Sequence, residues 1–273
     1  MEFFEAHTSD SLRLLGLLSI AEQPRWLVIH VHGYGGDFFS NQFVRTAHEY
    51  YPTRGISFLS FNLRTTAYVS EIYSEASVNY VGSSIANQDD TSKDIDGVLA
   101  ACGVDRSAVI LQGHSFGTNI VKRYARLNPE VARVIFLSPA DSVALYEQWL
   151  DGCKTPTPLT ADDQLVRWDL FGMAVGGARY ALPITAKCMQ ELLRSESFNE
   201  WSRRDAVISQ DALVVLGDQD PISNLGNTAD EAFLRQVVPN ARISRIGGSM
   251  HIFSGVEQRL CETVAEWILA NPA

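Results

Sequence analysis

The chain has 273 residues, of which 46% are hydrophobic and 20% charged, and its formal net charge is −10 at pH 7. This length and apolar content suffice for one large α/β domain or two smaller ones. The acidic balance leaves no basic stripe to neutralise phosphates, so it excludes nucleic acid and anionic membranes as expected partners and favours an uncharged or weakly polar small molecule.

The amino-terminal stretch MEFFEAHTSD is acidic, and no apolar run reaches the roughly 20 residues of a membrane span. We therefore expect no integral membrane span and a cytoplasmic location. Four widely separated cysteines form no C-x-x-C pair, which argues against a disulfide framework and against a cysteine-ligated metal. No repeat, low-complexity tract or linker divides the chain, which indicates one domain with an insertion.

Short runs rich in β-branched residues alternate with helical patterns along the chain. Residues Leu12 to Leu18 predict an antiparallel edge strand. Buried strands are predicted over Trp26–His32, Ile56–Phe61, Ala108–Leu111, Val131–Leu137, Ala212–Leu216 and Ala241–Ile246. One-sided apolar patterns predict helices over Asp94–Cys102, Phe116–Leu127 and Val256–Trp267. The alternation predicts a mostly parallel sheet with helices on both sides.

The segment 140–206 interrupts this alternation, because its apolar residues follow a helical pattern and no strand run is convincing. It lies between two strands, which places it over the carboxyl edge of the sheet, where ligands bind in such folds. We expect a mainly helical lid inserted into an α/β core formed by residues 1–139 and 207–273; extra core packing is the alternative. The lid residues expected to line a substrate pocket are Trp149, Trp168, Phe171 and Met173.

A G-x-S-x-G pentapeptide, GHSFG from Gly113 to Gly117, joins a predicted strand to a predicted helix. Small residues on both sides permit a sharp turn that projects the Ser115 hydroxyl into the cleft. The same turn places the Phe116 backbone N–H at a helix N-terminus, where it can stabilise an oxyanion. The sequence therefore predicts a nucleophilic serine; an ordinary turn serine is the alternative.

A serine hydroxyl needs a base within hydrogen-bond reach and an acid to orient that base. His251, in GGSMHIF, follows the last predicted strand and lies at the same sheet edge as Ser115. The carboxylate is expected after the strand Ala212–Leu216, where GDQDPIS offers Asp220, with Asp218 as the alternative. Asp141, in LSPAD, is a third candidate.

The remaining histidines are given other roles. His30 and His32 alternate on one strand, but no third ligand is close in sequence, so no metal site is expected. We expect His114 to pack beneath the serine turn, next to the substrate, and His7 and His48 to lie at the surface.

The motif HGYGG, residues 32–36, follows the first buried strand directly. Its flexible backbone can bring a second N–H, that of Tyr34, toward the oxyanion. Tyr34 is also expected to border the substrate.

With the order Ser115, Asp220, His251 and the motifs HGYGG, GHSFG, LSPAD and GDQDP, the chain resembles the α/β-hydrolase superfamily, in particular its esterase and monoacylglycerol-lipase-like branch, from about Ile29 to the C-terminus. The resemblance implies an eight-stranded, mainly parallel sheet, a lid, and acyl transfer to water without a cofactor. One departure follows Phe61, where relatives carry D-x-R-G-x-G and this chain reads NLRTTAY, which keeps only Arg64.

These features predict a serine hydrolase that cleaves a carboxylic ester of a small to medium, largely uncharged acyl substrate through an acyl-enzyme intermediate. A thioesterase, or an acyltransferase or cyclase that releases an acyl chain, uses the same residues and is the alternative. A non-catalytic ligand sensor on the same fold is the alternative from another class. The sequence does not indicate an oligomeric state.

Overall fold

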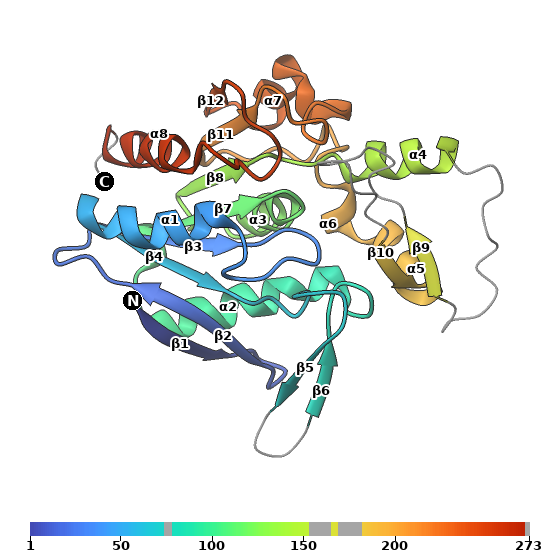
Figure 1. The fold of residues 1–273 in the computed structure, drawn as a ribbon, viewed down its shortest axis with the longest axis horizontal. Helices are drawn as coiled ribbons and strands as arrows, with labels where there is room; N and C mark the ends of the chain where they lie inside the picture. The colour runs from blue at the N-terminus through green and yellow to red at the C-terminus, as the bar shows by residue number, and fades with distance from the viewer. Residues whose placement is uncertain (74–77, 153–164, 169–181, 271–273) are drawn as a thin grey trace.

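The structure is a computed structural model that describes residues 1–73, 78–152, 165–168 and 182–270. One twisted sheet runs through the molecule and helices cover both of its faces (Figure 1). The sheet has eight strands, as predicted, and most neighbouring strands are parallel. Their spatial order is β1 (Glu2–His7), β2 (Arg13–Ser19), β4 (Ile56–Phe61), β3 (Trp26–Val31), β7 (Val109–His114), β8 (Arg133–Leu137), β11 (Asp211–Gly217) and β12 (Ala241–Ile246).

The predicted antiparallel strand near the N-terminus is present, but its expected place at the sheet edge is wrong. Strand β2 pairs with β4 on one side and with β1 on the other, antiparallel in both cases, so β1 forms the edge. The β1 sequence EFFEAH buries only Ala6 fully, and Phe3 is 90% exposed. An edge strand with so few buried residues lacks the hydrophobic pattern by which a strand is predicted.

Two separate hydrophobic clusters cover the two faces of the sheet. On one face, α1 (Gln42–Tyr50) and α8 (Glu257–Ala270) pack together against the sheet. On the other face lie α2 (Thr91–Cys102), α3 (Gly117–Leu127) and α7 (Glu231–Val237). Every residue of the central strands β3, β4, β7 and β8 is buried, as expected for strands covered on both sides.

The segment 140–206 contains both helices and strands. It begins with α4 (Ser142–Gly152) and later forms α5 (Ala186–Arg194) and α6 (Glu196–Asn199). Two short strands, β9 (Leu165–Trp168) and β10 (Leu182–Thr185), form an antiparallel pair that the sequence did not predict. A second unpredicted pair, β5 (Ser70–Tyr73) and β6 (Val78–Val81), stands in the connection after β4 (Figure 1).

Candidate active site

Ser115 follows the last residue of β7 and adopts a left-handed backbone conformation with φ 54°. Both glycines that flank it sit against neighbouring backbone. A Cβ on Gly113 would lie 2.5 Å from the Gly117 carbonyl oxygen, and one on Gly117 would lie 2.3 Å from the Val31 carbonyl oxygen. The first turn of α3 therefore packs so closely on β7 and β3 that neither glycine position has room for a side chain, and this close packing holds the sharp turn at Ser115.

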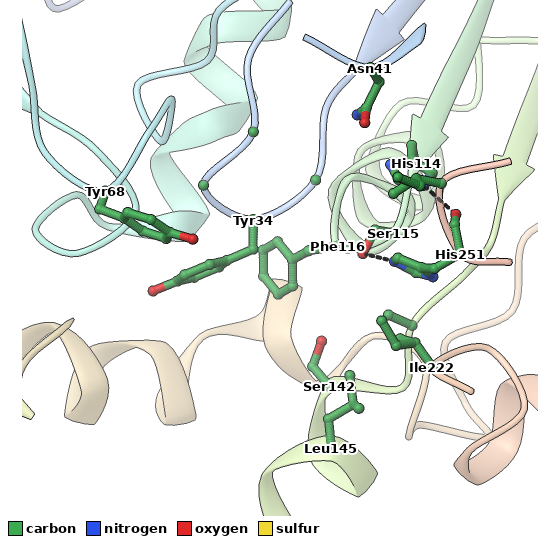
Figure 2. A pocket seen from close by; sticks show the side chains of 15 residues that line it. Tyr34, Asn41, Tyr68, His114, Ser115, Phe116, Ser142, Leu145, Ile222 and His251 are labelled. Carbon is green, nitrogen blue, oxygen red and sulfur yellow. Dashed lines mark hydrogen bonds between the residues drawn. The ribbon is translucent and has the colours of Figure 1, made fainter. Parts of the chain in front are cut away.

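Three predicted side chains that are far apart in the sequence form one hydrogen-bonded row. The Nε2 of His251 lies 2.8 Å from the Ser115 hydroxyl oxygen, and its Nδ1 lies 2.9 Å from Oδ2 of Asp220. Figure 2 shows the first of these contacts at the edge of a pocket. Because an ionised carboxylate only accepts hydrogen bonds, Nδ1 carries the proton of the neutral imidazole and Nε2 is left to accept the serine proton.

Asp220 is fully buried and accepts three hydrogen bonds. Besides His251, the Ser223 hydroxyl donates to Oδ2 at 2.6 Å and the Ile222 N–H donates to Oδ1 at 2.9 Å. Burial alone would raise the pKa of this carboxyl, but the hydrogen bonds and the nearby imidazole outweigh it and hold the pKa of Asp220 below its ordinary value. The carboxylate is thus ionised beside His251 at neutral pH.

The two alternative carboxylates are bonded elsewhere. Asp218 accepts the backbone N–H groups of Gly248 and Ser249 at 2.7 and 3.2 Å and so shapes the loop that carries His251. Asp141 accepts from the N–H of Ala144, the hydroxyl of Ser202 and the N–H of Asn227. Asp141 therefore ties the start of α4 to the core rather than facing the imidazole.

The two residues predicted to bind the oxyanion, Phe116 and Tyr34, both line the cavity that contains Ser115. Phe116 is the N-cap of α3, and no acceptor in the described part of the chain bonds to its N–H. The loop 33–36 packs directly on Ser115, since a Cβ on Gly33 would lie 3.0 Å from that of Ser115. His32 fixes this loop: its Nδ1 lies 2.8 Å from the Gly33 carbonyl oxygen, and its Nε2 accepts from the Leu63 N–H at 3.1 Å.

Two further histidines are buried, and the first lies at the site. His114 Nε2 donates to the carbonyl oxygen of His251 at 2.9 Å, and burial lowers the pKa of His114 to about 3, so its ring is neutral. His48 was expected at the surface, and this is wrong. It is only 3% exposed and bridges Ser19 and Ser60 through its two ring nitrogens at 2.9 and 2.7 Å.

A cavity of about 220 Å³ lies in front of Ser115 (Figure 2). Tyr34 and His114 line it, as expected. Of the predicted lid residues, Phe171 and Met173 lie outside the described residues, and Trp149 and Trp168 lie on α4 and β9 with side chains that are likewise outside the description. The other lining residues were not predicted: Asn41, Tyr68, Ala140, Ser142, Leu145, Ile222 and Ile252.

The segment NLRTTAY, which follows β4, supplies part of this cavity. Arg64 does not face the pocket. Its backbone N–H and its Nε donate to the buried Asp94, and its Nη1 and Nη2 donate to Asp10. Tyr68, four residues later, packs on the loop 33–36, since a Cβ on Gly35 would lie 2.7 Å from its ring. The departure NLRTTAY was the one sequence signal that pointed to this segment.

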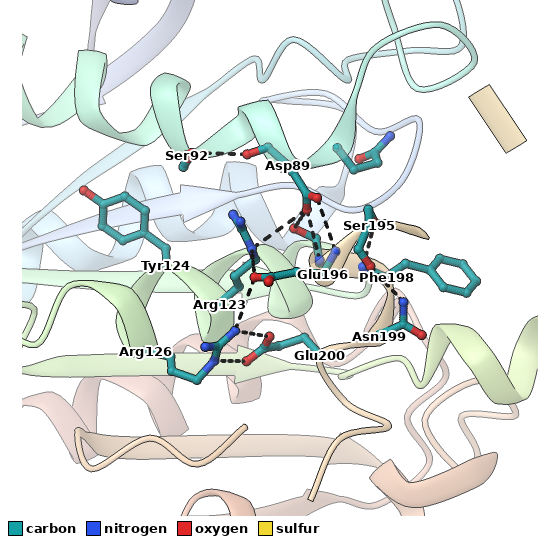
Figure 3. A network of polar contacts seen from close by, with 12 residues as sticks. Asp89, Ser92, Arg123, Tyr124, Arg126, Ser195, Glu196, Phe198, Asn199 and Glu200 are labelled. Carbon is teal, nitrogen blue, oxygen red and sulfur yellow. Dashed lines mark hydrogen bonds and ion pairs between the residues drawn. The ribbon is translucent and has the colours of Figure 1, made fainter. Parts of the chain in front are cut away.

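The end of the 140–206 segment is anchored to α3 by ion pairs (Figure 3). Asp89 accepts the backbone N–H of Glu196 at 3.2 Å, at the start of α6. Arg123 pairs with Glu196 at 3.2 Å, and Arg126 forms two bonds of 3.1 Å with Glu200. These contacts join the segment to the same helix that begins at the serine turn.

Lys122, on the inner side of α3, is fully buried beside this network. Its ammonium donates to the carbonyl and carboxylate oxygens of Glu200 at 2.9 and 3.3 Å and to the Ala206 carbonyl, and it lies 5.0 Å from the Trp201 ring centre. Burial lowers the pKa of Lys122 to about 8 although Glu200 opposes the shift.

Within the described residues, no group of three or more histidine, cysteine, aspartate or glutamate side chains could hold a metal ion. No helix in the described ranges is long and apolar enough to cross a membrane. The cytoplasmic location stays a prediction.

Neither a protein-family model nor a curated protein sequence matches the chain. Solved structures do. Est1E from Butyrivibrio proteoclasticus, with ferulic acid bound, superposes with a TM-score of 0.69 at 17% identity, covering 97% of this chain and 98% of that one. The α/β hydrolase GrgF from Penicillium sp. sh18 gives 0.68 at 17% identity over 99% of both chains. The esterase domain of a Rhodothermus marinus protein gives 0.61 at 16% identity over 100% and 99%.

These superpositions cover nearly the whole of each chain. The chain therefore has the α/β-hydrolase fold, and the fold expected from its motifs is confirmed. The structures that share this fold include several esterases.

Proposed function

We propose that this protein is a serine hydrolase that cleaves a carboxylic ester through an acyl-enzyme intermediate. The observation that carries the proposal is the hydrogen-bonded row Asp220–His251–Ser115, which ends at a hydroxyl facing a cavity. The likeness to solved esterases agrees with it.

The reaction has two halves. His251 Nε2 removes the proton of Ser115 as its oxygen attacks the ester carbonyl, while Asp220 stabilises the imidazolium that forms. The N–H groups of Phe116 and Tyr34 stabilise the negative charge on the carbonyl oxygen. His251 then gives its proton to the leaving alkoxide. In the second half it takes a proton from the water that attacks the acyl carbonyl and passes it to the Ser115 oxygen as the bond to the acyl group breaks, which releases the acid and restores the serine.

The cavity favours an uncharged substrate. Among its described lining residues there is no aspartate, glutamate, lysine or arginine, and His114 is neutral because its pKa is about 3. Burial also raises the pKa of the Tyr34 hydroxyl, so that group stays un-ionised. We propose that residues 140–206 act as the lid of this cavity, since Ser142 and Leu145 of α4 form one of its walls.

A fluorophosphonate probe tests the nucleophile directly. We expect labelling at Ser115, no labelling of Ser115→Ala, and a fall in kcat of about 10⁶ for that variant. Ser138→Ala is a matched control, because Ser138 also directly follows a strand, β8, and has a left-handed backbone with φ 46°. Its hydroxyl makes no hydrogen bond in the described part of the chain. A folded protein that the probe leaves unlabelled would contradict the proposal and favour a ligand sensor.

The leaving group is tested separately with p-nitrophenyl esters of graded chain length and the matching acyl thioesters. We expect ester hydrolysis to be the faster reaction. A higher kcat/KM for the thioesters, relative to their alkaline hydrolysis rates, would identify a thioesterase instead.

A further inference from the structure

Asn41 stands at the N-cap of α1, where an asparagine side chain ordinarily accepts a hydrogen bond from the first turn of the helix. Here it makes no capping bond. No hydrogen bond joins its carboxamide to any other described residue, and the side chain lines the cavity in front of Ser115. Figure 2 shows the amide directed into that cavity. The carboxamide is therefore available to a bound molecule.

Ser142 presents a second polar group from another wall. It is the first residue of α4 and only 4% exposed, and it lines the same cavity. Nothing in the described ranges hydrogen-bonds to its hydroxyl, which Figure 2 shows directed toward the pocket from the side opposite Asn41. A molecule bound in the cavity that covered this hydroxyl without a hydrogen bond would leave it unpaired, which is costly.

The rest of the described lining contains mostly apolar side chains and no charged acid or base. A hydrocarbon chain would leave the amide and the hydroxyl desolvated and unpaired, whereas an ionised substrate would find no counter-charge. Uncharged oxygen atoms satisfy both groups, because an amide N–H and a hydroxyl can each donate to them.

From this geometry we infer that Asn41 and Ser142 are specificity-determining residues that select an ester bearing uncharged hydrogen-bonding oxygens, such as ether or hydroxyl groups, over a plain hydrocarbon ester. The inference rests on the proposed ester hydrolysis. Each residue is expected to recognise an oxygen at one particular distance from the scissile carbonyl.

The test is an oxygen scan. One series consists of p-nitrophenyl hexanoate and its analogues with a single chain methylene replaced by oxygen at carbon 3, 4 or 5; the second makes the same replacement along the alcohol of hexyl acetate. Each kcat/KM is divided by the rate of alkaline hydrolysis of that ester, so that intrinsic reactivity cancels. The ratio of the oxygen analogue to the hydrocarbon parent is then compared between variants.

We expect the wild type to prefer at least one oxygen position by about tenfold, the value of one good hydrogen bond. Asn41→Leu and Ser142→Ala should each remove the preference at its own position, and the double variant should remove all of it. Leu145→Ala is the control: it shortens an apolar part of the same wall and should slow both members of a pair alike. The melting temperature of Asn41→Leu should be unchanged, because no capping bond is lost.

A wild type that favours the hydrocarbon at every position, or a double variant that keeps the wild-type ratios, would overturn the inference while leaving ester hydrolysis intact. If the folded wild type is neither labelled by the fluorophosphonate nor able to hydrolyse any ester, the proposed function is refuted, and this inference with it.

Discussion

Replacing Gly117 by alanine tests whether close backbone packing, rather than helix propensity, decides the residue at the start of α3. By propensity alone, alanine stabilises a helix by up to about 1 kcal/mol relative to glycine. In this structure the new Cβ would lie 2.3 Å from the Val31 carbonyl oxygen and 2.6 Å from that of His32. Overpacking of this kind costs about 1–3 kcal/mol, so we expect net destabilisation.

The activity should fall by more than the stability loss explains. Val31 is the last residue of β3, which is hydrogen-bonded between β4 and β7 in the middle of the sheet, so its carbonyl has little freedom to retreat. The start of α3 must move instead, and it carries Ser115 and the Phe116 N–H with it. A displacement of about 1 Å in such groups typically costs about 100-fold in rate.

Urea unfolding and kcat/KM for a p-nitrophenyl ester measure the two effects. Gly247→Ala is the matched control, because its Cβ would meet nothing closer than Asp218 Oδ2 at 3.8 Å and it should change stability by less than about 0.5 kcal/mol. A Gly117→Ala protein that is more stable than the wild type and equally active would refute the reasoning.

Three further predictions concern carboxylates and the buried lysine. Asp220→Asn should lower kcat/KM about 10³- to 10⁴-fold. The folded protein holds the pKa of Asp220 below its ordinary value, so the stability that this carboxylate contributes is fully present above about pH 4 and is lost on acidification. In urea unfolding, the difference in the free energy of unfolding between the wild type and Asp220→Asn should therefore shrink from pH 6 to pH 3. Asp218→Ala removes only loop contacts and should cost about tenfold in kcat/KM; a loss as large as that of Asp220→Asn would contradict the assignment. Lys122→Met should lower the free energy of unfolding by about 3 kcal/mol, whereas Lys187→Met, in an exposed i,i+4 pair, should change it by less than about 0.5; equal effects would be inconsistent with a buried anchor.

The central strands could be predicted because burial on both faces leaves uninterrupted apolar runs, as in WLVIHV and ISFLSF. Strand β1 could not, because an edge strand with one buried residue carries almost no pattern. The same holds for β9 and β10, which are four residues each and pair only with one another. Helix α1 was missed although Phe43, Val44, Ala47 and His48 share a buried face, because one of the four is a histidine.

The reacting side chains were easier to predict than the cavity. Ser115 directly follows β7, and Asp220 and His251 lie in the loops that follow β11 and β12. The carboxyl ends of these parallel strands lie at one sheet edge, so local motifs and chain order were enough to predict that the three side chains meet. Asn41 lies in the connection between β3 and α1, and Tyr68 lies in the connection between β4 and β5. Both residues line the cavity because these two connections fold over it. The path of such a connection cannot be predicted from a local sequence pattern, since it depends on contacts between segments that are distant in the chain.

The geometry of the row is supported by contacts that do not belong to it. The neutral His114, next to Ser115, donates a hydrogen bond to the carbonyl oxygen of His251. Asp218, in the loop after β11, accepts hydrogen bonds from the N–H groups of Gly248 and Ser249 in the loop after β12. The loops after β7, β11 and β12 are thus linked to one another even when a reacting side chain is removed. We therefore expect substitutions at Ser115 or Asp220 to change the chemistry of the site far more than its backbone, because the strain at Ser115, of order 1–3 kcal/mol, is held by glycine packing and not by the row itself.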